Sequence, residues 1–116
     1  MIRSDGSYVR DYIYVKDVAR AYMCLAEAIP CDEVNGQAFN FGNEMPVTVL
    51  QLVEQIQAVM GSTELEPQIL ATAEGEIHSQ YLSASKARDV LKWRPEFDPD
   101  DGLRETVEWY RGFLAV

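Results

Sequence analysis

One arginine, Arg10, is the first residue whose chemistry is worth considering, because the chain carries few cations. Its 116 residues contain 10 lysines and arginines against 19 aspartates and glutamates, so the formal net charge is -9. A guanidinium group can donate two parallel hydrogen bonds to a diphosphate at a low cost of desolvation. Arg10 is therefore a candidate for binding a phosphorylated ligand. The alternative is a structural ion pair with Asp11 or Asp17.

Two cysteines and a single histidine limit the metal and redox chemistry. Cys24 and Cys31 lie seven positions apart, form no CxxC motif and have no neighbouring set of histidine ligands. A disulfide framework and a zinc site are therefore not expected. Reduced thiols in the cytoplasm are the simplest interpretation.

The composition excludes several classes of partner. The few basic residues are scattered, whereas nucleic-acid binding needs a basic stripe that neutralises phosphates. No apolar run approaches the roughly 18 residues that a membrane span requires, and the first residues lack the apolar core of a signal peptide. We therefore expect a soluble, cytoplasmic protein that binds neither nucleic acid nor membrane.

The elements that must position Arg10 alternate between strand and helix. Residues 8–15 are rich in aromatic and β-branched types, which favours a strand. The apolar spacing predicts a helix over 17–29 that Pro30 ends, with Asp17 at its start, where a carboxylate suits the positive end of the helix dipole. Residues 38–42 are short, aromatic and bounded by glycine, which predicts a buried strand.

The rest of the chain predicts three further helices. Thr48 and the glutamine three residues later match a capping box and open a helix over 48–60. Ser83 is expected to cap a second helix, and an Asp-Pro pair opens a third over 98–114. Residues 72–80 show no periodicity and are expected to form a loop. The prediction is an α/β piece with about four helices and a few short strands.

Four segments carry a resemblance to a known family: residues 5–19, 38–43, 85–95 and 102–110. They resemble extended short-chain dehydrogenases, the NAD-dependent epimerases and dehydratases that act on nucleotide sugars. The first resembles that family's "DG..VRDYIYV.D.A.A" segment, the second its last Rossmann strand, the third its "SKAR..LGW.P" segment and the fourth its "GL..T..WY" terminal helix. The matches occur in family order and cover nearly the whole chain.

Within that family, residues 39–50 and 76–83 look most like CDP-glucose 4,6-dehydratases. UDP-sugar epimerases and GDP- or dTDP-sugar dehydratases share the same frame. The resemblance implies a parent enzyme in which NAD takes a hydride from the sugar C4, water is lost across C5 and C6, and the hydride returns to C6. Alternatives are a 4-epimerase or decarboxylase parent, or a free-standing binding or assembly module without catalysis.

The resemblance also implies a division of labour between two parts. An amino-terminal Rossmann domain would hold NAD and a catalytic Tyr-x-x-x-Lys pair, and residues 1–116 would be the carboxyl-terminal part that binds the sugar nucleotide. Residues 16–43 would supply the last Rossmann helix and strand. The sequence has no GxGxxG turn, and its Tyr12-x-x-x-Lys16 lies in the strand segment rather than on the family's catalytic helix. We therefore expect a fragment that neither binds NAD nor turns over substrate alone.

The resemblance assigns site residues as well. Arg10 matches the family arginine that contacts the nucleotide phosphates. Residues 74–78 occupy the place of an Arg-Pro-Gly-type loop over the nucleotide, yet no arginine lies between Gln55 and Arg88. Glu76 or His78 could instead bond to ribose hydroxyls or the base, with plain solvent exposure as the alternative for His78.

Aromatic and basic side chains elsewhere are interpreted structurally. Those at helical or helix-terminal spacing are expected to pack in the core rather than to form a platform for the base, and Tyr12 and Tyr14 are likewise expected to pack. Lys86 and Arg88 fit a solvated helix face. Uncovered helix faces and strand edges predict self-association. The aromatic residues assigned to the core are Trp93, Trp109, Tyr110 and Phe113.

Overall fold

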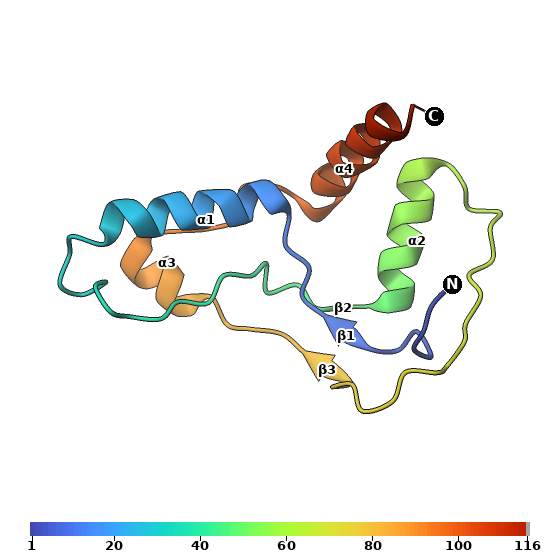
Figure 1. Ribbon diagram of the computed structural model, residues 1–116, viewed down its shortest axis with the longest axis horizontal. Helices are drawn as coiled ribbons and strands as arrows, with labels where there is room; N and C mark the ends of the chain where they lie inside the picture. The colour runs from blue at the N-terminus through green and yellow to red at the C-terminus, as the bar shows by residue number, and fades with distance from the viewer. Residues whose placement is uncertain (116) are drawn as a thin grey trace.

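The computed structural model describes residues 1–115, which form four helices and three two-residue strands (Figure 1). The mixed α/β class predicted from the sequence is confirmed. Helices make up most of the regular secondary structure, and long connections join several of the elements. In chain order the elements are β1 (Val9–Arg10), α1 (Val15–Ala28), β2 (Val47–Thr48), α2 (Val49–Met60), β3 (Ser79–Gln80), α3 (Ser85–Leu91) and α4 (Pro99–Leu114).

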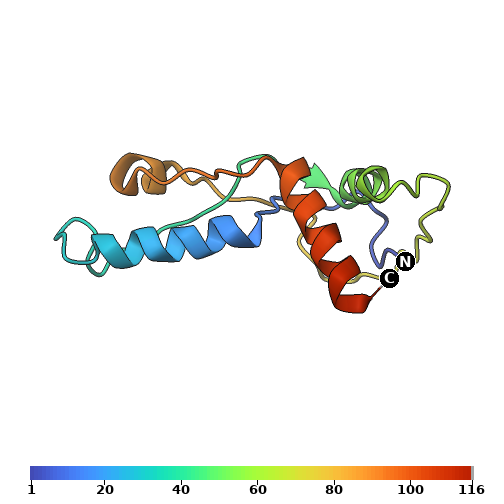
Figure 2. The same cartoon turned by 90° about the horizontal axis from the view of Figure 1, so that it is seen from above.

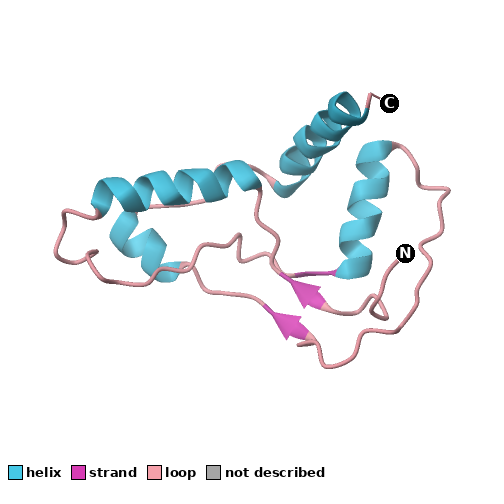
Figure 3. Cartoon of the chain, in the orientation of Figure 1, coloured by secondary structure: helices cyan, strands magenta, loops and turns pink. Residues whose placement is uncertain are grey.

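The sheet is small, and β1 is its central strand (Figure 3). β1 runs antiparallel to β2, with Val9 opposite Thr48, and parallel to β3, with Val9 opposite Ser79. The strand predicted over 8–15 is therefore too long, because only two of its residues find partners. The parallel partner β3 lies at the end of the segment expected to be a loop.

Local sequence signals set the boundaries of α2 and α4. The backbone N–H of Gln51 donates to the Thr48 hydroxyl at 3.1 Å, and the Gln51 side chain accepts from the Thr48 N–H at 2.8 Å, which completes the predicted capping box. Gly61 ends α2 in the left-handed conformation. The Asp98 carboxylate accepts from the N–H of Asp100 at 3.0 Å, as the Asp-Pro pair predicted.

The main apolar core lies between α1 and α3. Trp93 is only 3% exposed, which confirms its predicted packing. The side chains of Phe39 and Phe41 pack against this core from the long connection between α1 and β2. Ala84, rather than the predicted Ser83, occupies the N-cap of α3, although the Ser83 hydroxyl accepts from the N–H of Ser85 at 3.3 Å. The buried members of the core are Ala21, Val34, Ala84, Ala87, Leu91 and Trp93.

The strand predicted over 38–42 does not form. A strand needs a neighbouring strand to bond with its N–H and C=O groups, and within residues 1–115 none lies beside this segment. The carbonyl of Ala38 instead accepts from the Lys86 side chain at 3.0 Å. The segment is therefore an extended connection whose remaining edge is open.

The molecule is flat and open, with extents of 52 × 36 × 19 Å (Figure 2). Its radius of gyration is 17.0 Å, whereas a compact domain of this length has about 13 Å. Its accessible surface is 8147 Å², against roughly 6,400 Å² for a compact monomer of this mass. The shape predicts that further protein covers part of this surface.

Helices α1 and α4 carry much of the excess apolar surface. Tyr22 on α1 is 72% exposed, and on α4 Trp109 is 59% and Phe113 is 69% exposed. The prediction that Trp109, Tyr110 and Phe113 lie in the core is therefore wrong for the described chain. Helical spacing identifies an apolar face correctly, but it does not say whether these residues themselves contain the element that covers it.

Three further features bear on the expectations from composition. Both Cys24 and Cys31 are free thiols. Among residues 1–115, no cluster of histidine, cysteine, aspartate and glutamate side chains is arranged to hold a metal ion. In the same residues, no helix combines the length and the apolar character that crossing a bilayer demands.

Candidate functional site

Arg10 lies on the central strand β1 and is half-buried. Its Nη1 donates to the carbonyl of Val9 at 2.7 Å and to that of His78 at 3.3 Å. The predicted alternative, an ion pair with Asp11 or Asp17, does not form, and within residues 1–115 no carboxylate oxygen lies within 4 Å of this guanidinium. Its Nη2 and Nε have no hydrogen-bond partner in the same range and remain able to donate to a ligand.

Arg10 is surrounded by a cluster of polar and aromatic groups, which we call the β1–β3 cluster: Ser7, Tyr8, Arg10 and His78. The guanidinium carbon of Arg10 lies 5.8 Å from the centre of the Tyr8 ring, and the rings of Tyr8 and His78 are 5.1 Å apart. The Ser7 hydroxyl lies 3.0 Å from Nε2 of His78. The cluster combines a cation, a hydroxyl group and two π faces within one small surface.

The pairing of β1 with β3 brings His78 to this cluster. The N–H of Val9 donates to the carbonyl of His78 at 2.8 Å, so the residue just before β3 is fixed against β1. The Nδ1 of His78 lies 3.2 Å from the hydroxyl of Ser79. Both ring nitrogens therefore meet hydroxyl groups, although the side chain is exposed to solvent.

Glu76, the third predicted site residue, lies in a different setting. Its carboxylate is 3.8 Å from the guanidinium of Arg3, and both side chains are largely exposed. An exposed pair of this kind contributes little to stability. Two of the three predicted residues, Arg10 and His78, thus share direct contacts, whereas Glu76 is held by an arginine that the sequence did not single out.

Asp11, next to Arg10, holds the connection that leads into β2. Its carboxylate oxygens accept from the N–H groups of Glu44 at 3.0 Å and Met45 at 3.2 Å. A Cβ atom at Gly42 would lie 2.5 Å from the same carboxylate, so a larger residue there would displace the Asp11 side chain. Asp11 therefore positions the backbone beside the site rather than pairing with Arg10.

Asp17 performs a similar task for the segment before α4. Asp17 is 0% exposed. Helix α1 begins at Val15, two positions before the start predicted at Asp17, so Asp17 lies in the first turn of the helix. Its carboxylate accepts from the N–H groups of Glu96 at 2.9 Å and Phe97 at 3.3 Å and from the Arg20 side chain at 3.2 Å. Asp17 therefore joins α1 to the connection between α3 and α4.

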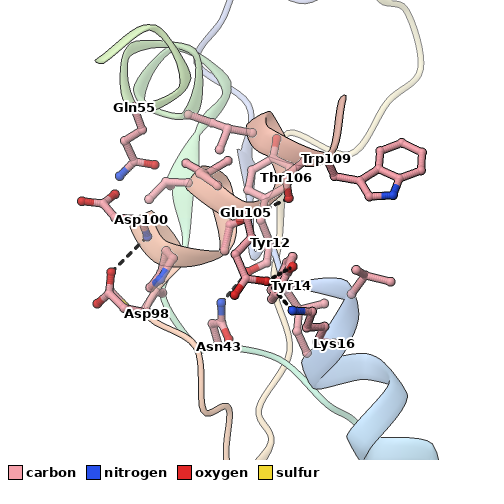
Figure 4. Close-up of a pocket in the computed structure, with 18 of the residues that line it drawn as sticks. Tyr12, Tyr14, Lys16, Asn43, Gln55, Asp98, Asp100, Glu105, Thr106 and Trp109 are labelled. Atoms are coloured by element: carbon pink, nitrogen blue, oxygen red, sulfur yellow. Dashed lines mark hydrogen bonds and ion pairs between the residues drawn. The ribbon is translucent and has the colours of Figure 1, made fainter. Parts of the chain in front are cut away.

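A second polar cluster joins α1 to α4 (Figure 4). The carboxylate of Glu105 accepts from the Tyr14 hydroxyl at 2.6 Å and from Nζ of Lys16 at 2.5 Å. The hydrogen bond from Lys16, followed by that from Tyr14, lowers the pKa of Glu105. The same bonds to Glu105 raise the pKa of Lys16 and that of Tyr14. Tyr14 does pack as predicted, with its ring centre 4.9 Å from that of Phe97, and it also takes part in this network.

Lys86 on α3 is exposed, as its spacing suggested, and Arg88 is half-buried, but both side chains also have partners in the structure. Lys86 donates to the side chain of Gln37 at 3.1 Å and lies over the Phe39 ring, 4.6 Å from its centre. Arg88 forms an ion pair with Glu44. Both side chains therefore hold the connection between α1 and β2 against α3. The sequence does not indicate this role, because the partners lie far away along the chain.

Among residues 1–115, no helix begins directly after a glycine-rich turn of the kind that holds a dinucleotide. Binding of NAD in doubly wound folds uses a glycine-rich turn between a strand and a helix, where N–H groups approach the pyrophosphate. Here α1 follows Tyr12-Ile13-Tyr14, and α2 follows β2 with no intervening turn.

The chain is similar to nucleotide-sugar epimerases and dehydratases. Residues 1–42 match the model of the NAD dependent epimerase/dehydratase family. The chain is 31% identical to a UDP-glucose 4-epimerase of Mycolicibacterium smegmatis over 95% of its own length and 34% of the relative's. It spans about a third of the length of the curated relatives that it matches.

Solved structures share the fold. The structure of a UDP-glucose 4-epimerase from Thermotoga maritima with UDP-glucose superposes with a TM-score of 0.81 at 34% identity, covering 97% of this chain and 35% of that one. A dTDP-glucose 4,6-dehydratase from Bacillus anthracis in complex with NAD gives 0.80 at 27% identity, covering 96% and 34%. The fold is therefore that of one part of extended epimerases and dehydratases.

Together, the matches support the NAD-dependent epimerase/dehydratase family for this chain. The relatives named here include both 4-epimerases and a 4,6-dehydratase, and they act on different nucleotides. The comparisons thus support the nucleotide-sugar class and not CDP-glucose in particular.

Proposed function

We propose that residues 1–116 form the substrate-binding part of an NAD-dependent nucleotide-sugar epimerase or dehydratase. The observation that carries the proposal is the half-buried guanidinium of Arg10, which within residues 1–115 has two nitrogens without a hydrogen-bond partner and no carboxylate oxygen within 4 Å. In a chain of net charge -9, a diphosphate must be drawn to such a local cation. The β1–β3 cluster offers that cation beside hydroxyl and aromatic groups.

Each member of the site has a proposed role in binding the nucleotide sugar. Arg10 donates to the diphosphate, for which its forked geometry is suited. His78 donates to or accepts from ribose hydroxyls or the base, and the carboxylate of Glu76, two positions earlier in the segment before β3, accepts from them. The pairing of β1 with β3 holds Arg10 and His78 at a fixed separation, so ligand binding by these two residues depends on the sheet.

The catalytic step belongs to the remainder of the parent enzyme. We propose that a Rossmann unit carrying NAD and a Tyr-x-x-x-Lys pair covers the exposed face of α1 and bonds with the open edge of residues 38–42. In support, Tyr22 on α1 is 72% exposed and the neighbouring segment is extended without a strand partner among the described residues. Alone, residues 1–116 are expected to bind a nucleotide sugar weakly, not to bind NAD, and to be inactive.

The finer assignment has two candidates. Residues 39–50 and 76–83 resemble CDP-glucose 4,6-dehydratases, which favours conversion of CDP-glucose to CDP-4-keto-6-deoxyglucose. The names of the relatives favour a UDP-sugar 4-epimerase instead. Product analysis of the parent enzyme separates the two, because only the dehydratase yields a 4-keto-6-deoxy sugar.

Titration calorimetry of the chain tests the binding proposal. The ligands are UDP-glucose, dTDP-glucose, CDP-glucose, free glucose and NAD. We expect binding of the nucleotide sugars, weakened about tenfold or more in Arg10→Ala, because a hydrogen bond to a charged group contributes about 1.5–3 kcal/mol. Arg104→Ala, an exposed arginine on α4 paired with Asp101, is the control and should bind normally.

Three results would count against the proposal. Nucleotide-sugar binding that Arg10→Ala leaves unchanged would show that the diphosphate lies elsewhere. Tight binding of NAD by these residues alone would contradict the division between a cofactor part and a substrate part. A free-standing binding module would be indicated instead if no NAD-binding segment is encoded in frame with this chain.

A further inference from the structure

A continuous series of hydrogen bonds runs from a carboxylate through the histidine of the β1–β3 cluster. The Ser7 hydroxyl lies 2.7 Å from Oδ1 of Asp5 and 3.0 Å from Nε2 of His78. The other ring nitrogen, Nδ1, lies 3.2 Å from the hydroxyl of the next residue in the chain. We call this series the Asp5 network, and its members are Asp5, Ser7, His78 and Ser79.

The Asp5 carboxylate sets the direction of the first bond. The backbone N–H of Ser7 donates to the same Oδ1 atom at 2.9 Å. The hydrogen bonds from the Ser7 side chain and backbone lower the pKa of Asp5, so at neutral pH its carboxylate is ionised and can only accept. Two oxygen atoms 2.7 Å apart need a proton between them. That proton is the single hydroxyl proton of Ser7, which therefore points to Asp5.

The second bond must then run from His78 to Ser7. The Ser7 oxygen has donated its only proton, so it faces Nε2 of His78 with a lone pair. Nε2 therefore carries a proton. In a neutral imidazole only one nitrogen is protonated, so Nδ1 of His78 is bare and accepts.

The third bond continues in the same direction. With Nδ1 of His78 bare, the Ser79 hydroxyl donates its proton to it. Within residues 1–115 this hydroxyl has no other hydrogen-bond partner, and the Ser79 side chain is exposed. Every proton of the Asp5 network thus points toward Asp5, and the outer end presents lone pairs. The bonds strengthen one another, because each polarises the next.

The sheet places this accepting end near the donating group of the site. Strand β1, which carries Arg10, lies beside β3 (Figure 1), with Val9 opposite Ser79. A guanidinium has only donors, and Nη2 and Nε of Arg10 have no partner within the described residues. Arg10 suits the oxygens of a diphosphate, whereas bare Nδ1 of His78 suits a donor. The two ends of the site therefore differ in chemistry.

We propose that Asp5 and Ser7 are positioning residues that fix His78 as a hydrogen-bond acceptor. Through Nδ1 of His78 and the hydroxyl of Ser79, this end of the site binds a donor group of the nucleotide, a ribose hydroxyl or the base N–H, rather than a phosphate oxygen. The inference rests on the proposed binding of a nucleotide sugar and specifies its orientation, with the diphosphate at Arg10 and the nucleoside at His78. Asp5 and Ser7 act through His78 and do not touch the ligand.

The position of the ring proton tests the proposal without any ligand. His78 is the only histidine in the sequence, so nitrogen NMR of the labelled chain shows one pair of imidazole signals. The pH is raised until these signals stop changing, so that the neutral ring is observed. We expect a single tautomer with its proton on Nε2. A major form with the proton on Nδ1 would overturn the proposal.

Variants at Ser7 identify the cause of the tautomer. Ser7→Ala removes the hydroxyl, so a measurable share of the ring should carry its proton on Nδ1, whereas Ser7→Thr keeps the hydroxyl and should preserve the tautomer. Ser79→Ala is the matched control, because it removes the hydroxyl at the other ring nitrogen and should leave the proton on Nε2. If Ser7→Ala does not fold, Asp5→Ala replaces it, because it frees the Ser7 proton to point at Nε2. Unchanged tautomer populations in the variant used would contradict the role of Ser7.

Calorimetry with a set of analogues tests the consequence for binding. The ligands are UDP-glucose, its 2′-deoxyribose and 3′-deoxyribose analogues, and its analogue methylated at N3 of the uracil. In the unchanged protein and in Ser7→Thr, loss of the group that donates to His78 or Ser79 should weaken binding about three- to tenfold, as for one hydrogen bond between uncharged groups. In Ser7→Ala the difference should be clearly smaller. The analogue that shows this pattern identifies the donor as a ribose hydroxyl or the base N–H.

The two proposals fail in different ways. If UDP-glucose binding depends on Arg10 but every analogue loses as much affinity in Ser7→Ala as in the unchanged protein, the proposed function stands and the acceptor role of His78 is wrong. Absence of UDP-glucose binding would contradict the proposed function and the ligand assigned here. The tautomer measured without ligand would still show whether Asp5 and Ser7 fix His78.

Discussion

The Nη1 of Arg10 lies 3.3 Å from the carbonyl oxygen of His78, a residue 68 positions further along the chain. This contact joins the central strand β1 to the segment that leads into β3. It leaves the Nη2 and Nε atoms of Arg10 without a partner inside residues 1–115. A cation held by the backbone on one side and free on the other is well arranged to bind an anion.

Replacing Arg10 separates charge from geometry. Arg10→Lys keeps the positive charge but loses the two parallel donors of the guanidinium group. Nucleotide-sugar affinity should therefore fall less than in Arg10→Ala, where the loss is about tenfold or more. Calorimetry with UDP-glucose and with UDP measures both. Equal affinity of the two variants and the unchanged protein would exclude a diphosphate contact at this residue.

Substitution of Asp17 should destabilise the fold. Asp17→Asn is expected to lower the free energy of unfolding by about 2–4 kcal/mol, because the N–H donors of Glu96 and Phe97 lose a buried, charged acceptor. Urea unfolding followed by circular dichroism provides the measurement. Asp32→Asn, at an exposed position in the turn after α1, should change stability by less than about 0.5 kcal/mol.

Two glycines with similar backbone angles should respond differently to alanine. Gly6 has φ +87°, and an added Cβ would lie 2.5 Å from Cγ of Leu50, whereas Gly36 has φ +73° and open space around it. We expect Gly36→Ala to cost about 1 kcal/mol of backbone strain and Gly6→Ala about 3 kcal/mol, because it adds a clash. Equal unfolding free energies for the two variants would contradict the packing of Leu50 on Gly6.

The contact between α1 and α4 should depend on pH. Glu105 has a lowered pKa in the folded protein, so the stability it contributes is present above its ordinary value of 4.5 and is lost as pH falls through the lowered value. Lys16 and Tyr14 have raised pKa values, so their contributions are present at neutral pH and are lost only as pH rises through those values, above the ordinary 10.5 and 10.0. Urea midpoints below pH 4.5 should fall less steeply in Glu105→Gln than in the unchanged protein, and identical slopes would contradict this role.

Helix boundaries could be predicted from the sequence because their signals are local. The capping box at Thr48 and the acid before Pro99 act within one turn of their own helix, and both appear in the structure. The buried position of Trp93 also follows from local pattern. Such features depend little on what surrounds the chain.

The strand over 38–42 and the burial of Trp109 could not be predicted, because each depends on something beyond the local pattern. A strand forms only beside another strand, and an apolar helix face is buried only where something covers it. The same reason hid the roles of Arg88 and Asp17, whose partners Glu44 and Glu96 are distant in the sequence. Arg10 was identified through its chemistry, whereas its contact with His78 required the pairing of β1 with β3.

The most direct test of the central claim is an NMR titration of residues 1–116 with UDP-glucose and, separately, with NAD. We predict that UDP-glucose shifts the signals of Ser7, Tyr8, Arg10 and His78, and that NAD shifts none of them at the same concentration. Signals that move with NAD alone, or with UDP-glucose at positions remote from the β1–β3 cluster, would contradict the assignment of these residues to substrate binding.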